Sequence, residues 1–140
     1  MAPPGERTTE EIPLARSPGR PAVLIVDDDA DTRDSLGEVF ADADYQVIAV
    51  EDGQKAFDYL DHQPPPDVVV LDLWMPVMDG WTLASQVLSG RLPKVPMLVV
   101  TASSAQFGYP VPSRYVLRKP VNPDRLLRLA QELIGERDRV

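Results

Sequence analysis

The sequence contains no cysteine and only one histidine, and both shortages narrow the chemistry open to this chain. Without cysteine there is no disulfide framework, no thiolate zinc site and no cysteine nucleophile. The one histidine, His62, lies in a polar Asp-His-Gln segment before three prolines, where we expect an exposed helix end. No second histidine is present to form a metal site or a proton relay with it.

The chain also lacks an excess of basic residues and any long apolar run. Its formal net charge is −8, so it would repel nucleic-acid phosphates, and we expect no binding to nucleic acid. No apolar stretch approaches the roughly 20 residues of a membrane span, so we expect no membrane association. The first residues, MAPPGERTTEE, show no basic region followed by an apolar core. They do not form a secretory signal, and the expected location is cytoplasmic.

What is present is the composition of an ordinary globular domain. The 140 residues are 44% hydrophobic and 26% charged, which suffices for one domain with a proper core. Residues 1–20 are rich in proline, charged residues and threonine and have little to bury, so we expect a disordered tail. Residues 21–140 are expected to form the folded domain.

Strand and helix patterns alternate from Pro21 onward, which predicts an α/β fold with helices on both faces of a parallel sheet. Apolar runs predict strands at residues 23–26, 45–50, 68–71, 97–100 and 115–117. Apolar residues at helical spacing predict four helices, with Asp52 and Asn122 as caps and Gly135 as the stop of the last helix.

Polar side chains follow four of these strands directly. In open parallel sheets the carboxyl ends of the strands meet at one edge, where ligands bind. We therefore expect carboxylates, a hydroxyl and an amine to lie close together at this edge. In chain order these residues are Asp27, Asp28, Asp72, Thr101 and Lys119.

This constellation resembles the receiver domains of two-component response regulators, and the resemblance covers roughly residues 21–135. It implies a flavodoxin-like, doubly wound fold of the chemotaxis receiver type, in which a five-stranded parallel sheet has the order 2-1-3-4-5. The matching residues are Asp27-Asp28, Asp72 within LDLWMPVMDG, Thr101-Ala102 and Lys119-Pro120.

The resemblance also implies a function, that of a phosphoacceptor switch in a phosphorelay. Asp72 would accept a phosphoryl group from a histidine kinase or phosphotransfer protein, and the surface that binds an unidentified output protein would change. Thr101 would bond a phosphoryl oxygen, and Lys119 would neutralise its charge. Such a protein catalyses its own phosphorylation and dephosphorylation but is not a metabolic enzyme.

A magnesium site belongs to the same expectation. Converging carboxylates repel one another without a cation, and ligation by oxygen atoms alone suits Mg²⁺. By the resemblance, Asp28 and Asp72 bind the metal directly, Asp27 acts largely through water, and Trp74 supplies its backbone carbonyl. The family has a cis peptide bond at the Lys119-Pro120 position.

Three further positions are expected to modulate the site. By the resemblance, the side chains of Trp74 and Ser103 flank the entrance for attacking water. The family's aromatic switch stands three residues before the lysine, where this chain has Val116, and Tyr115 comes one position earlier. Because a shift of one residue reverses the face of a strand, either a bulge adjusts the register or Tyr115 is not the usual switch.

Residues 103–113 depart from the family pattern. The segment SSAQFGYPVPS contains Gly108, Pro110 and Pro112 where the family carries its fourth helix. Proline removes a hydrogen-bond donor and clashes with the preceding turn, so this helix is predicted to be short or missing. At most one turn is expected, near residues 103–107.

Two other functions stay open at this point. The first is a docking module that signals through binding without phosphorylation. The second is a phosphohydrolase that uses Asp72 as nucleophile on external substrates. Phosphohydrolases of the haloacid dehalogenase type carry a second acid two residues after the nucleophile, and Trp74 at that position argues against this alternative.

Overall fold

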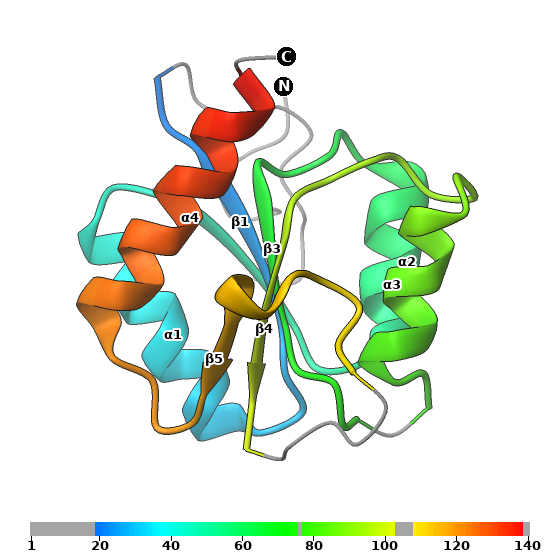
Figure 1. Ribbon diagram of the computed structural model, residues 1–140, viewed down its shortest axis with the longest axis horizontal. Coiled ribbons are helices and arrows are strands. Elements are labelled where there is room, and N and C mark those ends of the chain that lie inside the picture. The colour runs from blue at the N-terminus through cyan, green and yellow to red at the C-terminus, as the bar shows by residue number, and fades with distance from the viewer. Residues whose placement is uncertain (1–18, 76, 103–107, 139–140) are drawn as a thin grey trace, which may run out of the picture.

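A five-stranded parallel sheet organises the part of the chain that the computed structural model describes, residues 19–75, 77–102 and 108–138 (Figure 1). Its strand order is β2-β1-β3-β4-β5, which confirms the predicted order. The predicted tail falls outside the described residues, except for Gly19 and Arg20. The strands are β1 (Ala22–Val26), β2 (Gln46–Val50), β3 (Val68–Leu71), β4 (Met97–Thr101) and β5 (Val116–Arg118).

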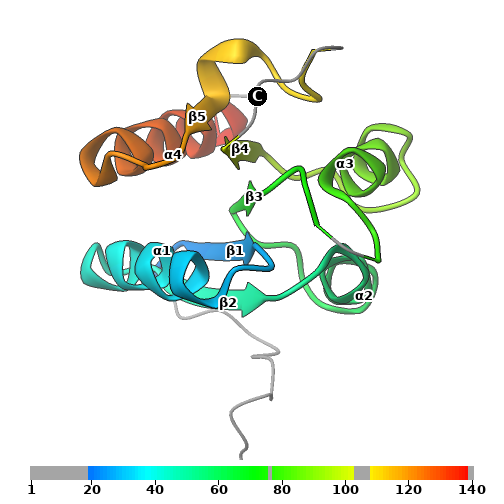
Figure 2. The same ribbon diagram turned by 90° about the horizontal axis from the view of Figure 1, so that it is seen from below.

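Within the described residues, four α-helices cover the two faces of this sheet (Figure 2). They are α1 (Ala30–Asp42), α2 (Gly53–His62), α3 (Gly80–Leu88) and α4 (Pro123–Asp138). Helices α1 and α4 lie on one face, and α2 and α3 lie on the other. No helix in the described part of the chain is both long enough and apolar enough to span a bilayer.

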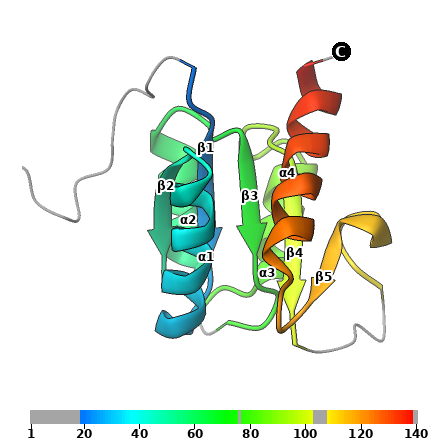
Figure 3. The same ribbon diagram turned by 90° about the vertical axis from the view of Figure 1, so that its left-hand side faces the viewer.

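The central strands are apolar on both sides because each face is covered by helices. In β1, Leu24 packs with the residues of α2 and α3, whereas Val23 and Ile25 pack with those of α1 and α4. Every residue of β1 and β3 is buried. The carboxyl ends of the strands point to one edge of the sheet, as the arrowheads in Figure 3 show.

Side-chain caps fix where the helices begin. Asp52 and Asp79 each accept a hydrogen bond of 2.8 Å from the backbone N–H three residues later, which starts α2 and α3. Asn122 caps α4 in the same way, at 3.0 Å. Asp29, which follows the acidic pair, caps α1 by accepting from the N–H of Thr32. Caps of this kind satisfy backbone donors that have no partner inside the helix.

The predicted end of the last helix at Gly135 is wrong, because α4 continues to Asp138. Glycine costs a helix about 1 kcal/mol relative to alanine, but a long-range contact holds this last turn. Arg137 Nη1 lies 2.8 Å from Oδ1 of the buried Asp67, at the start of β3. Asp67 in turn accepts a hydrogen bond of 2.7 Å from the N–H of Ala22, so the pair joins α4 to two strands.

The region between β4 and β5 also differs from the predicted strand boundary. Tyr115 belongs to a 3-10 helix, Ser113–Tyr115, whose last N–H donates to the Pro112 carbonyl at 2.9 Å, and β5 begins only at Val116. In residues 102 and 108–115, the described part of this connection, this short turn is the only helical element. The single turn expected near residues 103–107 lies outside the described residues.

Candidate functional site

The sheet itself fixes the two acidic residues that follow its central strands. The N–H of Asp72 donates to the Val26 carbonyl at 2.9 Å, and the N–H of Asp27 donates to the Val50 carbonyl at 3.3 Å. Each bond continues the parallel ladder one residue beyond its strand. Both carboxylates therefore stand on rigid backbone rather than on a free loop.

The loop after Asp72 turns back tightly on the same backbone. A Cβ atom at Gly80 would lie 2.4 Å from the carbonyl oxygen of Asp72, closer than real Cβ atoms approach such an oxygen. Only glycine permits this approach. The start of α3 is thereby held directly against Asp72, the residue that follows β3.

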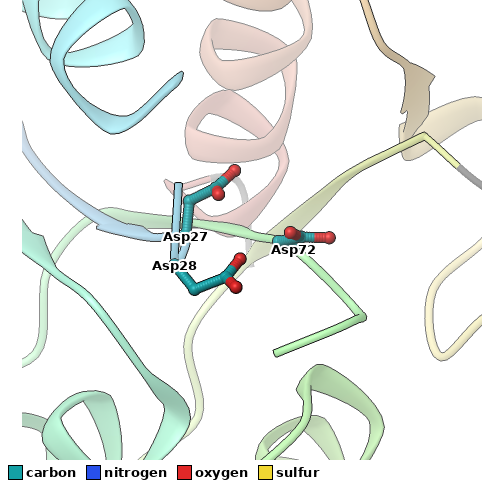
Figure 4. A group of neighbouring side chains, drawn as sticks. All are labelled: Asp27, Asp28 and Asp72. Atoms are coloured by element: carbon teal, nitrogen blue, oxygen red, sulfur yellow. The ribbon is translucent and has the colours of Figure 1, made fainter. Parts of the chain in front are cut away.

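Three carboxylates meet at this edge of the sheet (Figure 4). Oxygen atoms of Asp27, Asp28 and Asp72 all lie within 4.8 Å of one another. Asp27 and Asp72 are buried, whereas Asp28 is exposed, so the cluster opens to solvent on the side of Asp28. Like charges at this separation repel one another.

Lys119 provides positive charge at the base of the cluster. Its Nζ atom lies 2.9 Å from Asp27 Oδ2 and 3.4 Å from Asp72 Oδ2. Its backbone N–H donates to the carbonyl of Thr101 at 3.0 Å, which ties the residue after β5 to the end of β4. The peptide bond between Lys119 and Pro120 is cis.

Burial and charge act in opposite directions on these groups. Burial, together with the neighbouring Asp27 carboxylate, raises the pKa of Asp72, although Lys119 and the N–H of Trp74 act against this rise. Burial alone would lower the pKa of Lys119, but its hydrogen bond to Asp27 and the charges of both carboxylates outweigh that effect and raise it. The ammonium is therefore retained, and the Asp72 carboxylate is left short of positive partners.

The donor set fits a divalent cation. Three carboxylates and one ammonium give a formal charge of −3 + 1 = −2. The donors are all oxygen atoms, which hard cations such as Mg²⁺ prefer. Asp28, the exposed member, leaves room for the waters that Mg²⁺ retains.

The other predicted site residues occupy different positions around the cluster. Thr101 is the last residue of β4 and is fully buried. The backbone N–H of Trp74 donates to Asp72 Oδ1 at 3.3 Å, and the residue is 54% exposed. Ser103 lies outside the described residues.

Tyr115 faces the helix layer rather than solvent. Its side chain is buried in the same cluster as Leu117 and the apolar residues of α1 and α4. The guanidinium of Arg114 lies over the ring, 4.7 Å from its centroid. Val116, at the position of the family's aromatic residue, is partly buried and pairs with Val99 of β4.

Sequence reasoning missed Arg33 and a pocket. The Nη1 atom of Arg33 donates to the Asp27 carbonyl at 2.9 Å, which braces the acidic loop from the first turn of α1. Arg33 stands four residues after the cap Asp29, and residues at this spacing lie on the same face of a helix, so the sequence could have indicated that its side chain reaches the loop. The pocket, of about 560 Å³, lies between α1 and α4 and adjoins Lys119 and Pro120. Its lining comes from two helices that are far apart in the sequence, so no local sequence pattern predicts it.

Comparison with known proteins gives consistent matches. The family model described as the response regulator receiver domain matches residues 23–131. The two-component response regulator ORR5 of Oryza sativa subsp. japonica is 28% identical over 121 residues, which are 83% of this chain and 90% of that protein.

Solved structures match over nearly their full length. The chemotaxis response regulator CheY4 of Vibrio cholerae is 30% identical with a TM-score of 0.69, covering 81% of this chain and 98% of that one. The receiver domain of the sensor histidine kinase PA1611 from Pseudomonas aeruginosa PAO1 is 25% identical with a TM-score of 0.72, covering 84% and 99%. That structure has a magnesium ion coordinated in its active site cleft.

Proposed function

The chain belongs to the family of response regulator receiver domains, and from this premise we propose that it is a phosphoacceptor switch in which Asp72 accepts the phosphoryl group. The observation that carries the proposal is the meeting of three carboxylates with the Lys119 ammonium at the carboxyl edge of the sheet. A buried carboxylate on rigid backbone beside an amine is suited to nucleophilic attack on phosphorus.

We propose that Asp28 and Asp72 hold Mg²⁺, with Asp27 and the Trp74 carbonyl completing the site. When bound, the cation neutralises the carboxylates and the transferring phosphoryl oxygens. One oxygen of Asp72 forms the bond to phosphorus while the bond between phosphorus and the donor's imidazole nitrogen breaks, and the electron pair remains on that nitrogen. The reaction moves a phosphoryl group and needs no other co-reactant.

Lys119 and Thr101 are the residues that sense the new group. Lys119 lies within 3.4 Å of Asp72 Oδ2, so its ammonium is placed to meet a phosphoryl oxygen there. The Thr101 hydroxyl is the proposed second partner. Because the Lys119 N–H bonds the Thr101 carbonyl, movement at either residue is passed to the ends of β4 and β5.

We propose that the pocket between α1 and α4 receives the phosphodonor, a histidine kinase or phosphotransfer protein. The pocket adjoins Lys119, and its lining includes the apolar side chains of Leu36, Val39, Val121 and Leu126. An apolar surface beside the reacting carboxylate suits a partner protein that must place its phosphohistidine at Asp72. The output partner would read the surface altered by phosphorylation.

The direct test of the function is incubation with acetyl phosphate and Mg²⁺, with the label located by mass spectrometry. We expect base-labile phosphate on Asp72 that needs Mg²⁺ and is absent from Asp72→Asn. Unchanged labelling of Asp72→Asn would refute the assignment. A partner that binds equally well with and without phosphate would favour a docking module, and turnover of a general phosphatase substrate would favour a phosphohydrolase.

The docking proposal has its own test, in which Ser35 is replaced by tryptophan. Ser35 lines the pocket and is exposed, so the bulky side chain obstructs the pocket without entering the core. Ser35→Trp should slow phosphorylation by a protein donor but leave phosphorylation by acetyl phosphate unchanged. The control is Ser85→Trp at an exposed position of α3. Equal slowing with both donors would show that the variant damages the site itself.

A further inference from the structure

We propose that Trp81 is a positioning residue that holds the Trp74 indole as a fixed wall beside Asp72 and so prolongs the lifetime of the phosphoryl group. This inference rests on the proposed phosphorylation of Asp72. It assigns a role to a residue of α3 that has no part in the acidic cluster.

The side chain of Trp74 has rotational freedom that a neighbouring residue must restrict. It stands two residues after Asp72, and its N–H donates to Asp72 Oδ1 at 3.3 Å, so its backbone is at the site. The residue is nevertheless 54% exposed, so much of its surface meets solvent rather than protein. An exposed tryptophan changes rotamer readily unless a neighbour restrains it.

Trp81 supplies that restraint. The two indole rings meet edge to face, with centroids 4.6 Å apart and planes at 76°. This is the preferred geometry of an aromatic pair, in which the edge of one ring meets the face of the other. Trp81 thus fixes both the place and the orientation of the Trp74 ring.

The backbone under Trp81 is itself firmly placed. Trp81 is the second residue of α3, between the tightly packed Gly80 and the cap bond from Thr82 N–H to Asp79. Gly80 lies directly against the backbone of Asp72. The backbone of Trp81 is therefore anchored, through its neighbour Gly80, against the phosphoacceptor, which is what a positioning residue requires.

A strained residue lies between the two tryptophans in the sequence. Val77, between them in sequence, has φ of 70° and is 81% exposed. A β-branched residue in the left-handed region is a genuine outlier and persists only when the surroundings over-determine it. The contact between Trp74 and Trp81 ties the two ends of this loop together and is one such constraint.

The expected effect of the contact is modest and measurable. Aromatic pairs of this kind favour the paired arrangement by roughly two- to tenfold, which corresponds to about 0.5–1.5 kcal/mol. Loss of Trp81 should therefore speed hydrolysis of the Asp72 phosphate by about two- to tenfold, since the freed Trp74 ring no longer excludes water continuously.

The test is a double-mutant cycle of Trp74→Ala, Trp81→Ala and the double variant. Each protein is phosphorylated with acetyl phosphate and Mg²⁺, the donor is removed, and the rate of phosphate loss is measured. Trp81→Ala should speed the loss in the wild-type background and add nothing in the Trp74→Ala background. Trp81→Phe should restore a rate near that of wild type. Leu88→Ala, which shortens an exposed side chain on the same helix, is the control.

The outcomes separate this inference from the function on which it rests. An unchanged rate in Trp81→Ala, or an effect that persists without Trp74, would overturn the positioning role, because a general effect on α3 does not depend on Trp74. Absence of label on the wild-type protein would refute the phosphoacceptor assignment itself. Fluorescence anisotropy tests the contact without phosphorylation: Trp74, the single tryptophan left in both proteins, should be more mobile in Trp81→Ala than in Trp81→Phe.

Discussion

Replacing Asp72 by asparagine should stabilise the metal-free protein even though it abolishes phosphorylation. Asp72 lies within 4.8 Å of the buried Asp27 carboxylate, and this pair repels by about 3.5 kcal/mol at an effective dielectric constant of 20, whereas solvent screens the exposed Asp28. The attraction between Asp72 and Lys119, whose atoms lie 3.4 Å apart, stabilises the ionised carboxylate by about 5 kcal/mol at the same dielectric constant. Because Lys119 lies closer to Asp27 and shares its charge between the two carboxylates, these terms largely cancel. The net cost, about 1–2 kcal/mol, comes first from burial of the charge, which raises the pKa of Asp72.

Asparagine removes this charge while keeping an oxygen and nearly the same shape. Urea unfolding in EDTA should therefore show the Asp72→Asn protein to be more stable by about 1–2 kcal/mol. In excess Mg²⁺ the difference should shrink, because a ligand that binds the folded state stabilises it. Asp34→Asn, which removes the same charge from an exposed position of α1, is the control.

The pH dependence of stability predicts independently that Asp72→Asn is the more stable protein. Because the pKa of Asp72 is raised in the folded protein, the folded state binds its proton more tightly than the unfolded state does. This contribution to stability is fully present below the unfolded pKa, near 3.8, and is lost as the pH rises through the raised pKa. The advantage of Asp72→Asn should therefore grow over that interval. An asparagine variant that is equally or less stable than wild type in EDTA at neutral pH would refute the reasoning.

Three further predictions follow from contacts around the site and at the opposite edge. Lys119→Ala should impair phosphorylation by acetyl phosphate while Mg²⁺ still binds, because the amine neutralises charge and is not a metal ligand; lost Mg²⁺ affinity with a normal rate would reverse these roles. Arg137→Gln should lower the free energy of unfolding by about 1 kcal/mol and speed hydrogen exchange in the last turn of α4, since the ion pair between Arg137 and Asp67 is lost; unchanged exchange there would contradict the contact. Gly80→Ala should destabilise the protein by several times the few tenths of a kcal/mol typical of surface substitutions, because its Cβ would collide with the Asp72 carbonyl; a stability within about 0.5 kcal/mol of wild type in urea would refute that collision.

The order of the elements and the identity of the acidic residues could be predicted from the sequence alone. Apolar runs such as Val68–Leu71 identify buried strands, and Asp72 follows that run directly. Parallel strands place their carboxyl ends at one edge, so adjacency in sequence already implies proximity in space for Asp27 and Asp72. Caps such as Asp52 are equally local, because the cap side chain accepts from the backbone N–H three residues later.

Helix ends that depend on contacts with residues far away in the sequence could not be predicted in this way. The sequence predicts that α4 stops at Gly135, but the contact between Arg137 and Asp67 joins residues far apart in the chain and carries the helix to Asp138. Local propensity is weak, and tertiary contacts override it at element ends. The boundary of β5 was missed for a different, local reason. Tyr115 follows the apolar pattern of a strand, but its N–H donates to the carbonyl of Pro112, three residues earlier, and the residue ends a 3-10 turn.

The chemistry shows the same division. The sequence alone determined which residue types stand at the edge of the sheet, because that follows from the period and length of the apolar runs. Only the tertiary structure decided that Lys119 lies nearer to Asp27 than to Asp72, and that Trp81 meets Trp74 edge to face. These arrangements depend on side-chain rotamers and on the packing of α3 against the loop after β3. No local sequence pattern encodes them, because the whole fold sets the distances between separate elements.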